Sequence, residues 1–417
     1  MRTRAALALV ATAGLMGCAG GTSPGFFNPS AEELVWPVPP EQPRVRYLGQ
    51  VASDRDIGKT SGFFDGLKQG LLGTESETLV TKRPFDVHVD GRGHIYVSGG
   101  TVGAILMLMP EQQEAQILAP EGPGALLKPM GLAGDSQDLL YVADATAARV
   151  VVLDPFMGFV RSYGSRDVFL NPVDVDVSPD GDRIYVVDSQ LHQLVIFSRE
   201  GELLRRVGKD EGDIGAKQTR MADAAHRLST ASGSEEEDAS ADAHAGTGEP
   251  SDMVENRGNG PGEFRWPAFL EVSADGTVYV SDGMNFRIQA LDADGNFLRE
   301  FGRQGDVAGA FARPKGVTVD REGHVYVVDA AFSNIQIFDA EGRLLLAFAE
   351  FGPGAGQLWM PSGITIDDQD RIFVADRYND RVQVFEYLPD PGPELPMDPD
   401  DPGAMAEFDD GRMNGSD

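Results

Sequence analysis

Residues 361–385 read PSGITIDDQDRIFVADRYNDRVQVF, and this stretch contains three short runs of apolar residues. The first run is residues 364–366, the second is centred on residues 373–374, and the third is residues 381–385. An Asp-rich segment separates the first two runs. Because β-branched and aromatic residues favour strands and Asp favours turns, the stretch predicts three strands and an all-β fold.

The same unit recurs along the chain. Each copy begins at a proline and then carries an aromatic residue followed by valine. The prolines are Pro84, Pro129, Pro172, Pro267, Pro314 and Pro361. The five intervals are 45, 43, 95, 47 and 47 residues. Such regular spacing indicates an array of structural repeats.

The turns within each copy predict its number of strands. Most copies contain a first Asp-Gly or Glu-Gly turn, and three contain a second. The first turns are at Asp90, Asp180, Asp275 and Glu322, and the second are at Glu200, Asp294 and Glu341. Glycine supplies the positive φ that tight hairpins need. Two hairpins give four antiparallel strands, and repeats of this length with four strands are blades of a β-propeller. Six copies predict six blades within residues 44–388.

The last copy provides only three strands before an acidic segment begins. Residues 44–49 form a strand-like sequence with no hairpin partner nearby, and they resemble the fourth strands of other copies. We expect this N-terminal strand to complete the sixth blade, because it would cover an otherwise exposed edge and close the ring.

The copies share a pattern: Pro-x-Gly-[Val/Ile]-x-[Val/Ile]-Asp, then Val-Tyr-Val-x-Asp, then Asn-x-Arg-[Ile/Val]-Gln-x-[Leu/Phe]. It is clearest in the fourth and sixth copies. This pattern resembles the NHL repeat family, and the resemblance implies a six-bladed propeller over roughly residues 44–388. Such propellers serve as binding platforms and as enzymes, so the resemblance implies no particular activity.

The N-terminus has the features of a secretory signal. Arg2 and Arg4 precede an apolar run, residues 5–16, that is too short to span a membrane. Residues 15–18 resemble a bacterial lipobox, which predicts a lipoprotein signal peptide at 1–17 and lipidation of Cys18. An ordinary signal peptide with an incidental cysteine is the alternative.

A lipidated Cys18 would place the protein in the bacterial cell envelope. Ala19 stands where, in the lipoprotein pattern, Asp would retain the protein at the inner membrane, so an outer-membrane anchor is favoured. Residues 18–43 are predicted to be a lipidated, proline-rich tether. Because Cys18 is the single cysteine, the fold forms no intramolecular disulfide.

The formal net charge of −31 argues against binding to nucleic acid, whose phosphates attract clustered Lys and Arg. Much of this charge lies in two acidic segments, residues 210–257 and 389–417, whose composition predicts disorder. The first is an insert between blades three and four. Residues 63–72 show helical spacing and predict a short amphipathic helix.

An Asp ends the second strand of five copies, and its repetition favours a structural role. These residues are Asp144, Asp188, Asp282, Asp329 and Asp376, and Gly99 stands at this place in the first copy. We expect each Asp to accept hydrogen bonds from turn amides. Arg149, Arg287 and Arg381, five residues later, are the expected partners.

The sequence shows no catalytic or metal-binding constellation. A related propeller lyase that forms peptide amides uses zinc-binding histidines on inner strands. Here His88 lies on an inner strand and His192 in a loop, too few for a zinc site. We therefore expect no metal, no cofactor and no catalytic residue.

The loops that follow the Asp-ended strands carry mixed aromatic and amide side chains, which suit recognition of a ligand. The candidate binding residues are His192, Asn285, Phe286, Phe332, Arg377, Tyr378 and Asn379. The first hypothesis is a membrane-anchored, monomeric, non-enzymatic propeller that binds a protein, peptide or glycan through this face. The alternatives are a lactonase-like or lyase-like enzyme with a divalent metal in the channel, and a structural component of an envelope assembly.

Overall fold

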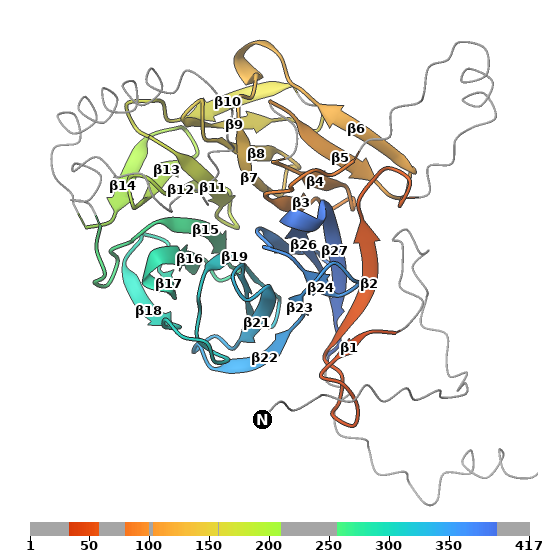
Figure 1. Cartoon of the computed structure of the whole chain (residues 1–417). Helices are drawn as coiled ribbons and strands as arrows, with labels where there is room; N and C mark the ends of the chain where they lie inside the picture. Colours follow the sequence, from red (N-terminus) through yellow and green to blue (C-terminus); the bar gives the residue numbers. More distant parts are fainter. Residues whose placement is uncertain (1–32, 58–79, 100–102, 157, 210–256, 390–417) are drawn as a thin grey trace, which may run out of the picture.

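The computed structural model describes residues 33–57, 80–99, 103–156, 158–209 and 257–389. The expected helix at 63–72 and the expected lipidation site Cys18 lie outside these residues. So do residues 210–256 of the predicted insert and nearly all of the segment 389–417. Six sheets of four antiparallel strands form a ring, and they follow one another around it in chain order (Figure 1).

The first three blades are built from consecutive strands. Blade one contains β3 (Val87–Val89), β4 (Ile95–Val97), β5 (Ile105–Met109) and β6 (Glu114–Leu118). Blade two contains β7 (Pro129–Gly134), β8 (Leu140–Asp144), β9 (Arg149–Leu153) and β10 (Phe159–Tyr163). Blade three contains β11 (Pro172–Val177), β12 (Arg183–Asp188), β13 (Gln193–Ser198) and β14 (Leu203–Val207).

Blades four and five follow the same plan, and blade six departs from it. Blade four contains β15 (Pro267–Val272), β16 (Val278–Asp282), β17 (Arg287–Leu291) and β18 (Phe297–Phe301). Blade five contains β19 (Pro314–Val319), β20 (Val325–Asp329), β21 (Asn334–Phe338) and β22 (Leu344–Phe348). Blade six contains β25 (Ile364–Ile366), β26 (Arg371–Asp376), β27 (Arg381–Tyr387) and β2 (Val45–Val51), with β1 (Val35–Trp36) at its edge.

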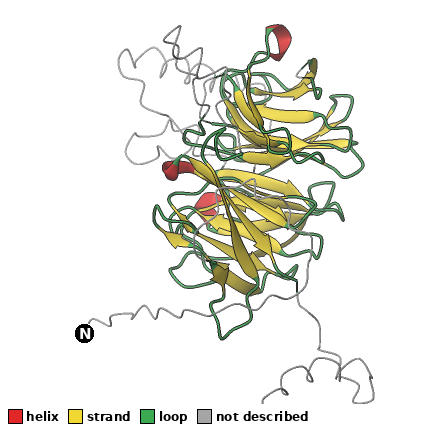
Figure 2. Ribbon diagram, turned by 90° about the vertical axis from the view of Figure 1, so that its right-hand side faces the viewer, coloured by secondary structure: helices red, strands yellow, loops and turns green. Residues whose placement is uncertain are grey.

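The described chain is almost entirely strand and loop (Figure 2). A short parallel pair, β23 (Glu350–Phe351) and β24 (Gln357–Leu358), lies between blades five and six. The described helical segments are three short 3-10 turns, η1 (Gly122–Gly124), η2 (Gly283–Asn285) and η3 (Arg377–Asn379). No helix in this part of the chain is long and apolar enough to cross a membrane.

The hydrophobic core is divided among the blade interfaces. Most clusters of buried side chains join two neighbouring blades, as the cluster around Tyr163 and Phe197 joins blades two and three. The cluster between blades four and five also reaches Phe85 and Met130 of blades one and two. Middle strands are covered on both faces, so β8 and β20 are buried along their whole length. Because both faces are buried, the sequences of these strands are continuous apolar runs and do not alternate between apolar and polar residues.

The N-terminal strand closes the ring, as expected. Strand β2 pairs antiparallel with β27, with Val45 opposite Tyr387 and Val51 opposite Val382, and the two strands lie side by side in Figure 1. The side chain of Arg46 also forms an ion pair with Glu386.

The proline-rich segment that precedes β2 contributes more than a tether. Strand β1 pairs with the start of β2, and the Trp36 ring lies 5.9 Å from Phe348 and 5.8 Å from Phe385. Part of the segment expected to link anchor and propeller, including Leu34 and Trp36, therefore packs on blade six.

Candidate functional site: the loop face and the channel

One end of the ring carries both the connections between blades and the loops that follow each second strand. We call this end the loop face, and its loops after the second strands are residues 145–148, 189–192, 283–286, 330–333 and 377–380. The buried aspartates lie directly beneath it. Asp188 accepts hydrogen bonds from the amides of Leu170, Asn171, Gln190 and Leu191 at 2.7 to 3.0 Å. One carboxylate thus holds two loops together. The sequence predicted its bonds to the turn amides of Gln190 and Leu191 but not those to the connection before the blade.

The same arrangement recurs around the ring, with different partners. In blades four and six, Arg287 and Arg381 donate through Nε to Asp282 and Asp376 at 3.0 and 2.8 Å. In blade two, Arg149 instead donates to the carbonyl of Ala125. Burial raises the pKa of Asp188, Asp282 and Asp376, while the hydrogen bonds that they accept act against this rise.

Most of the predicted binding residues support the loop face instead of projecting from it. His192 is 0% exposed, and its Nδ1 accepts a hydrogen bond from the amide of Trp266 at 3.1 Å. Arg377 is also buried. Asn285 and Asn379 donate to Asp282 and Asp376, 2.8 Å away in each case.

Three aromatic candidates remain, and they differ in exposure. Phe286 and Phe332 are half-buried, and Phe286 packs against the cluster between blades four and five. Tyr378 is 40% exposed and is the one candidate of the seven that is an exposed side chain.

Tyr378 is part of a larger exposed feature that includes two residues not predicted from the sequence. The ring of Trp359 lies 5.8 Å from Tyr378, nearly parallel to it, and 5.8 Å from Phe351, edge to face. Trp359 and Phe351 are 43% and 63% exposed. The guanidinium of Arg83 lies over Tyr378 at 5.6 Å. We call Phe351, Trp359 and Tyr378 the aromatic ridge.

The central channel is lined by the first strand of each blade. The rings of Phe85 and Phe269, from opposite sides of the ring, stack across the channel at 5.1 Å. A cavity of about 240 Å³ is lined by Phe269 and by inner-strand residues that include Asp86, Asp174, Asp176 and Glu271. The channel is therefore an acidic pocket, narrowed by a pair of phenylalanines.

The channel carboxylates also join neighbouring blades. Asp86 accepts a hydrogen bond from the amide of Leu132, and Asp174 accepts one from that of Leu270, each at 2.8 Å. Asp174 fits because Gly131 has no side chain: a Cβ there would lie 2.0 Å from the carboxylate. Asp86 and Asp174 therefore already accept backbone hydrogen bonds that hold neighbouring blades together. In the described part of the chain, no group of three or more His, Cys, Asp or Glu has metal-binding geometry.

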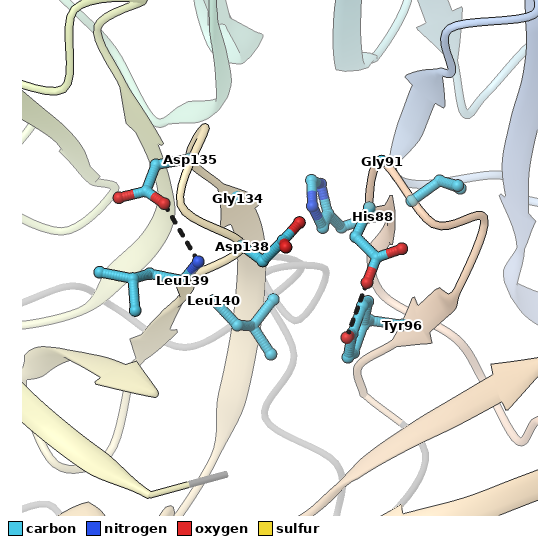
Figure 3. Close-up of a pocket in the computed structure, with 10 residues that line it drawn as sticks. His88, Gly91, Tyr96, Gly134, Asp135, Asp138, Leu139 and Leu140 are labelled. Atoms are coloured by element: carbon cyan, nitrogen blue, oxygen red, sulfur yellow. Dashed lines mark hydrogen bonds between the residues drawn. The ribbon is translucent and has the colours of Figure 1, made fainter. Parts of the chain in front are cut away.

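A second cavity of about 160 Å³ lies between blades one and two, at the end opposite the loop face. Figure 3 shows the His88 side chain directed toward the Gly134–Asp138 turn, with Tyr96 donating to Asp90 and the amide of Leu139 donating to Asp135. Burial lowers the pKa of His88 to about 4, so this histidine is neutral near pH 7.

We expect the protein to lose stability as pH rises from about 4 to about 7. Burial raises the pKa of Asp86 and Asp176 to about 7, and it also raises those of Asp174 and Glu271. The folded state therefore binds protons that the unfolded chain has released, and its free energy of unfolding falls as those protons leave. The lowered pKa of His88 makes the free energy of unfolding rise with pH below about pH 6.5. The four carboxyl groups with raised pKa values outweigh this single histidine.

Calorimetry should accordingly give a Tm several degrees higher near pH 5 than near pH 7.5. Asp176→Asn should reduce this difference, whereas Asp182→Asn, an exposed residue in a turn, should leave it unchanged. A Tm that rises with pH over this interval would contradict the expectation.

The ring, its blades and its narrowed channel define a six-bladed β-propeller. Residues 358–385 match the family model of the NHL repeat, and this stretch contains one of the two copies in which the sequence pattern was clearest. No curated protein matches the chain at a significant level.

Several solved propellers are similar to this chain. A protein of unknown function from Bacteroides thetaiotaomicron is 15% identical, with a TM-score of 0.51 over 74% of this chain and 70% of that one. A streptogramin B lyase is 13% identical, with a TM-score of 0.48 over 74% and 94%. A gluconolactonase from Xanthomonas campestris is 16% identical, with a TM-score of 0.49 over 74% and 88%. At these identities the similarity shows the fold alone.

Proposed function

We propose that this propeller is a non-enzymatic, lipid-anchored protein that binds a macromolecular ligand through its loop face. The observation that carries this proposal is the aromatic ridge. Its three large aromatic side chains lie together and are exposed to solvent. Exposed apolar patches of this kind favour aggregation or mark a surface that a partner covers. Trp, Tyr and Arg are also the residues that contribute most binding energy at protein interfaces.

The ridge is held in place before any ligand arrives. The amide of Trp359 donates to the buried carboxylate of Asp376 at 2.7 Å, and the amide of Tyr378 donates to the carbonyl of Trp359. Asn379 donates to the carbonyl of Gly352, next to Phe351. Because these loops are already ordered, binding loses little conformational entropy there, which favours affinity.

Trp359→Ala and Tyr378→Ala should each reduce ligand capture at least about tenfold, because each removes a large part of a contiguous contact surface. The assay is capture from detergent-solubilised envelope by the immobilised full chain, with photo-cross-linking from position 378 to identify what is bound. Melting temperatures should stay near that of the parent, since both side chains are exposed.

Phe156→Ala is the matched control. Phe156 is 92% exposed but lies in the turn between β9 and β10, at the other end of the ring. Its loss should leave capture unchanged. If both ridge variants capture as much as the parent, the binding site is elsewhere.

A further inference from the structure

Charge is distributed very unevenly between the two ends of the propeller. At the end opposite the loop face, the turns within blades carry nineteen acidic residues and four arginines. These turns are residues 90–94, 110–113, 135–139, 154–158, 178–182, 199–202, 273–277, 292–296, 320–324, 339–343 and 367–370. This end strongly attracts cations and repels anions.

The loop face has the opposite character around the channel. We use the term channel mouth for the residues that directly precede or follow the prolines of the inner strands. Its cations are Arg83, Lys128, Arg313 and Lys315, to which Arg257, Arg265 and Arg377 of adjoining loops are added. No acidic residue occupies any of these positions. In a chain with a net charge of −31, the concentration of cations here indicates an anionic ligand.

Two of these arginines lie close to each other on blade four. The guanidinium of Arg257 lies 5.6 Å from the ring centre of Trp266, and Arg265 precedes Trp266 in the chain. Burial and the positive charge of Arg265 together lower the pKa of Arg257. The Nε of Arg265 is buried with no hydrogen-bond partner among the described residues. A bound carboxylate would relieve the repulsion and satisfy an arginine donor.

The backbone at the channel mouth is held in an uncommon conformation. Arg83, Trp266 and Met360 each precede a proline and have φ between 43° and 54°, a region that non-glycine residues rarely adopt. The buried aspartate Asp282 fixes the neighbouring amide of Arg265 at 2.7 Å. Strain of this kind persists where the surroundings impose it, and it often accompanies a ligand site. Beside Trp266, a small cavity of about 30 Å³ is lined by Lys315 and Ser189.

The aromatic ridge favours a protein ligand over a polysaccharide. Sugar rings would stack on free aromatic faces, but one face of Trp359 is covered by Tyr378, and Tyr378 is covered in turn by Arg83. The aromatic ridge thus combines partly stacked rings with a neighbouring cation, a composition typical of protein interfaces. We therefore infer that the loop face binds an acidic segment of a partner protein, whose carboxylates contact the cations of the channel mouth while its apolar side chains pack on the aromatic ridge. This inference rests on the proposed function.

Fluorescence anisotropy of a labelled Glu/Tyr copolymer, added to the full chain carrying Cys18→Ser, tests the inference. The copolymer should bind, a Lys/Tyr copolymer should not, and binding should weaken as salt screens the charges. Arg265→Glu combined with Arg313→Glu should weaken binding at least about tenfold. Arg321→Glu reverses an exposed charge at the opposite end and should have no effect. Should the reversed pair lower the Tm, Arg265→Gln with Arg313→Gln removes the charges more gently.

Equal binding of both copolymers, or no binding of the Glu/Tyr copolymer, would overturn the inference. So would tighter binding of polygalacturonate, which would identify an acidic polysaccharide as the ligand. If Trp359→Ala abolishes envelope capture while the Arg265 and Arg313 variants retain it, the result supports the proposed function. The same result would contradict the inference that the ligand is an acidic protein segment.

Discussion

A chain that lacks all residues up to Gln50 should fail to fold cooperatively. Strand β2 supplies the outer pairing of β27, and the deleted part of it buries Val45 and Tyr47. Each buried large side chain stabilises the fold by about 1.5–3 kcal/mol. Together with the lost backbone pairing, this approaches the whole stability of an ordinary domain, about 5–15 kcal/mol. Calorimetry should show no sharp transition.

Two further variants make this prediction specific. Tyr47→Ala keeps the strand but removes a ring packed 5.5 Å from Phe385, and it should cost about 3–5 kcal/mol. A chain that ends at Pro389 should melt like the parent, because it keeps all of β27. If the N-terminal deletion also melts like the parent, the ring does not depend on closure by β2.

Asp188→Ala should destabilise the protein by about 3 kcal/mol or more. It leaves four backbone amides without their acceptor at a place where the carboxylate is fully buried. The substitution also removes the cost of burying a charge, but the unpaired amides outweigh that gain. Denaturant unfolding measures the difference.

Asp182→Ala serves as the control, since Asp182 lies in the same blade and is exposed. It should change stability by less than about 0.5 kcal/mol. Equal effects of the two substitutions would show that Asp188 does not hold the loops together.

The architecture was predictable because it depends on residues that repeat. Six prolines at nearly constant spacing indicated six blades, and the missing fourth strand of the last blade assigned residues 44–49 to that place. The role of the aspartates was predictable for the same reason. Contacts formed once, such as that of Trp36 with Phe385, left no periodic signal and were not predicted.

The candidate site was predicted only in part, because exposure depends on neighbours far apart in the sequence. His192 is in a loop of the expected kind, yet Trp266, 74 residues away, covers it. Trp359 and Phe351 lie in a connection between blades, and their proximity to Tyr378 follows only from the folded ring. Two large aromatic residues in a glycine-rich connection, residues 349–360, were the available signal.

Closure of the ring by β2 and β27 has a consequence for the timing of biogenesis. Arg46 and its partner Glu386 are 340 positions apart. At roughly 5–20 residues per second, a ribosome needs roughly 20–70 s to synthesise that distance. Throughout that time the edge of β2 has no partner and is open to pairing with other chains. The propeller can therefore be completed only after synthesis has passed its last strand, and one of the earliest strands made, β2, is among the last to be protected.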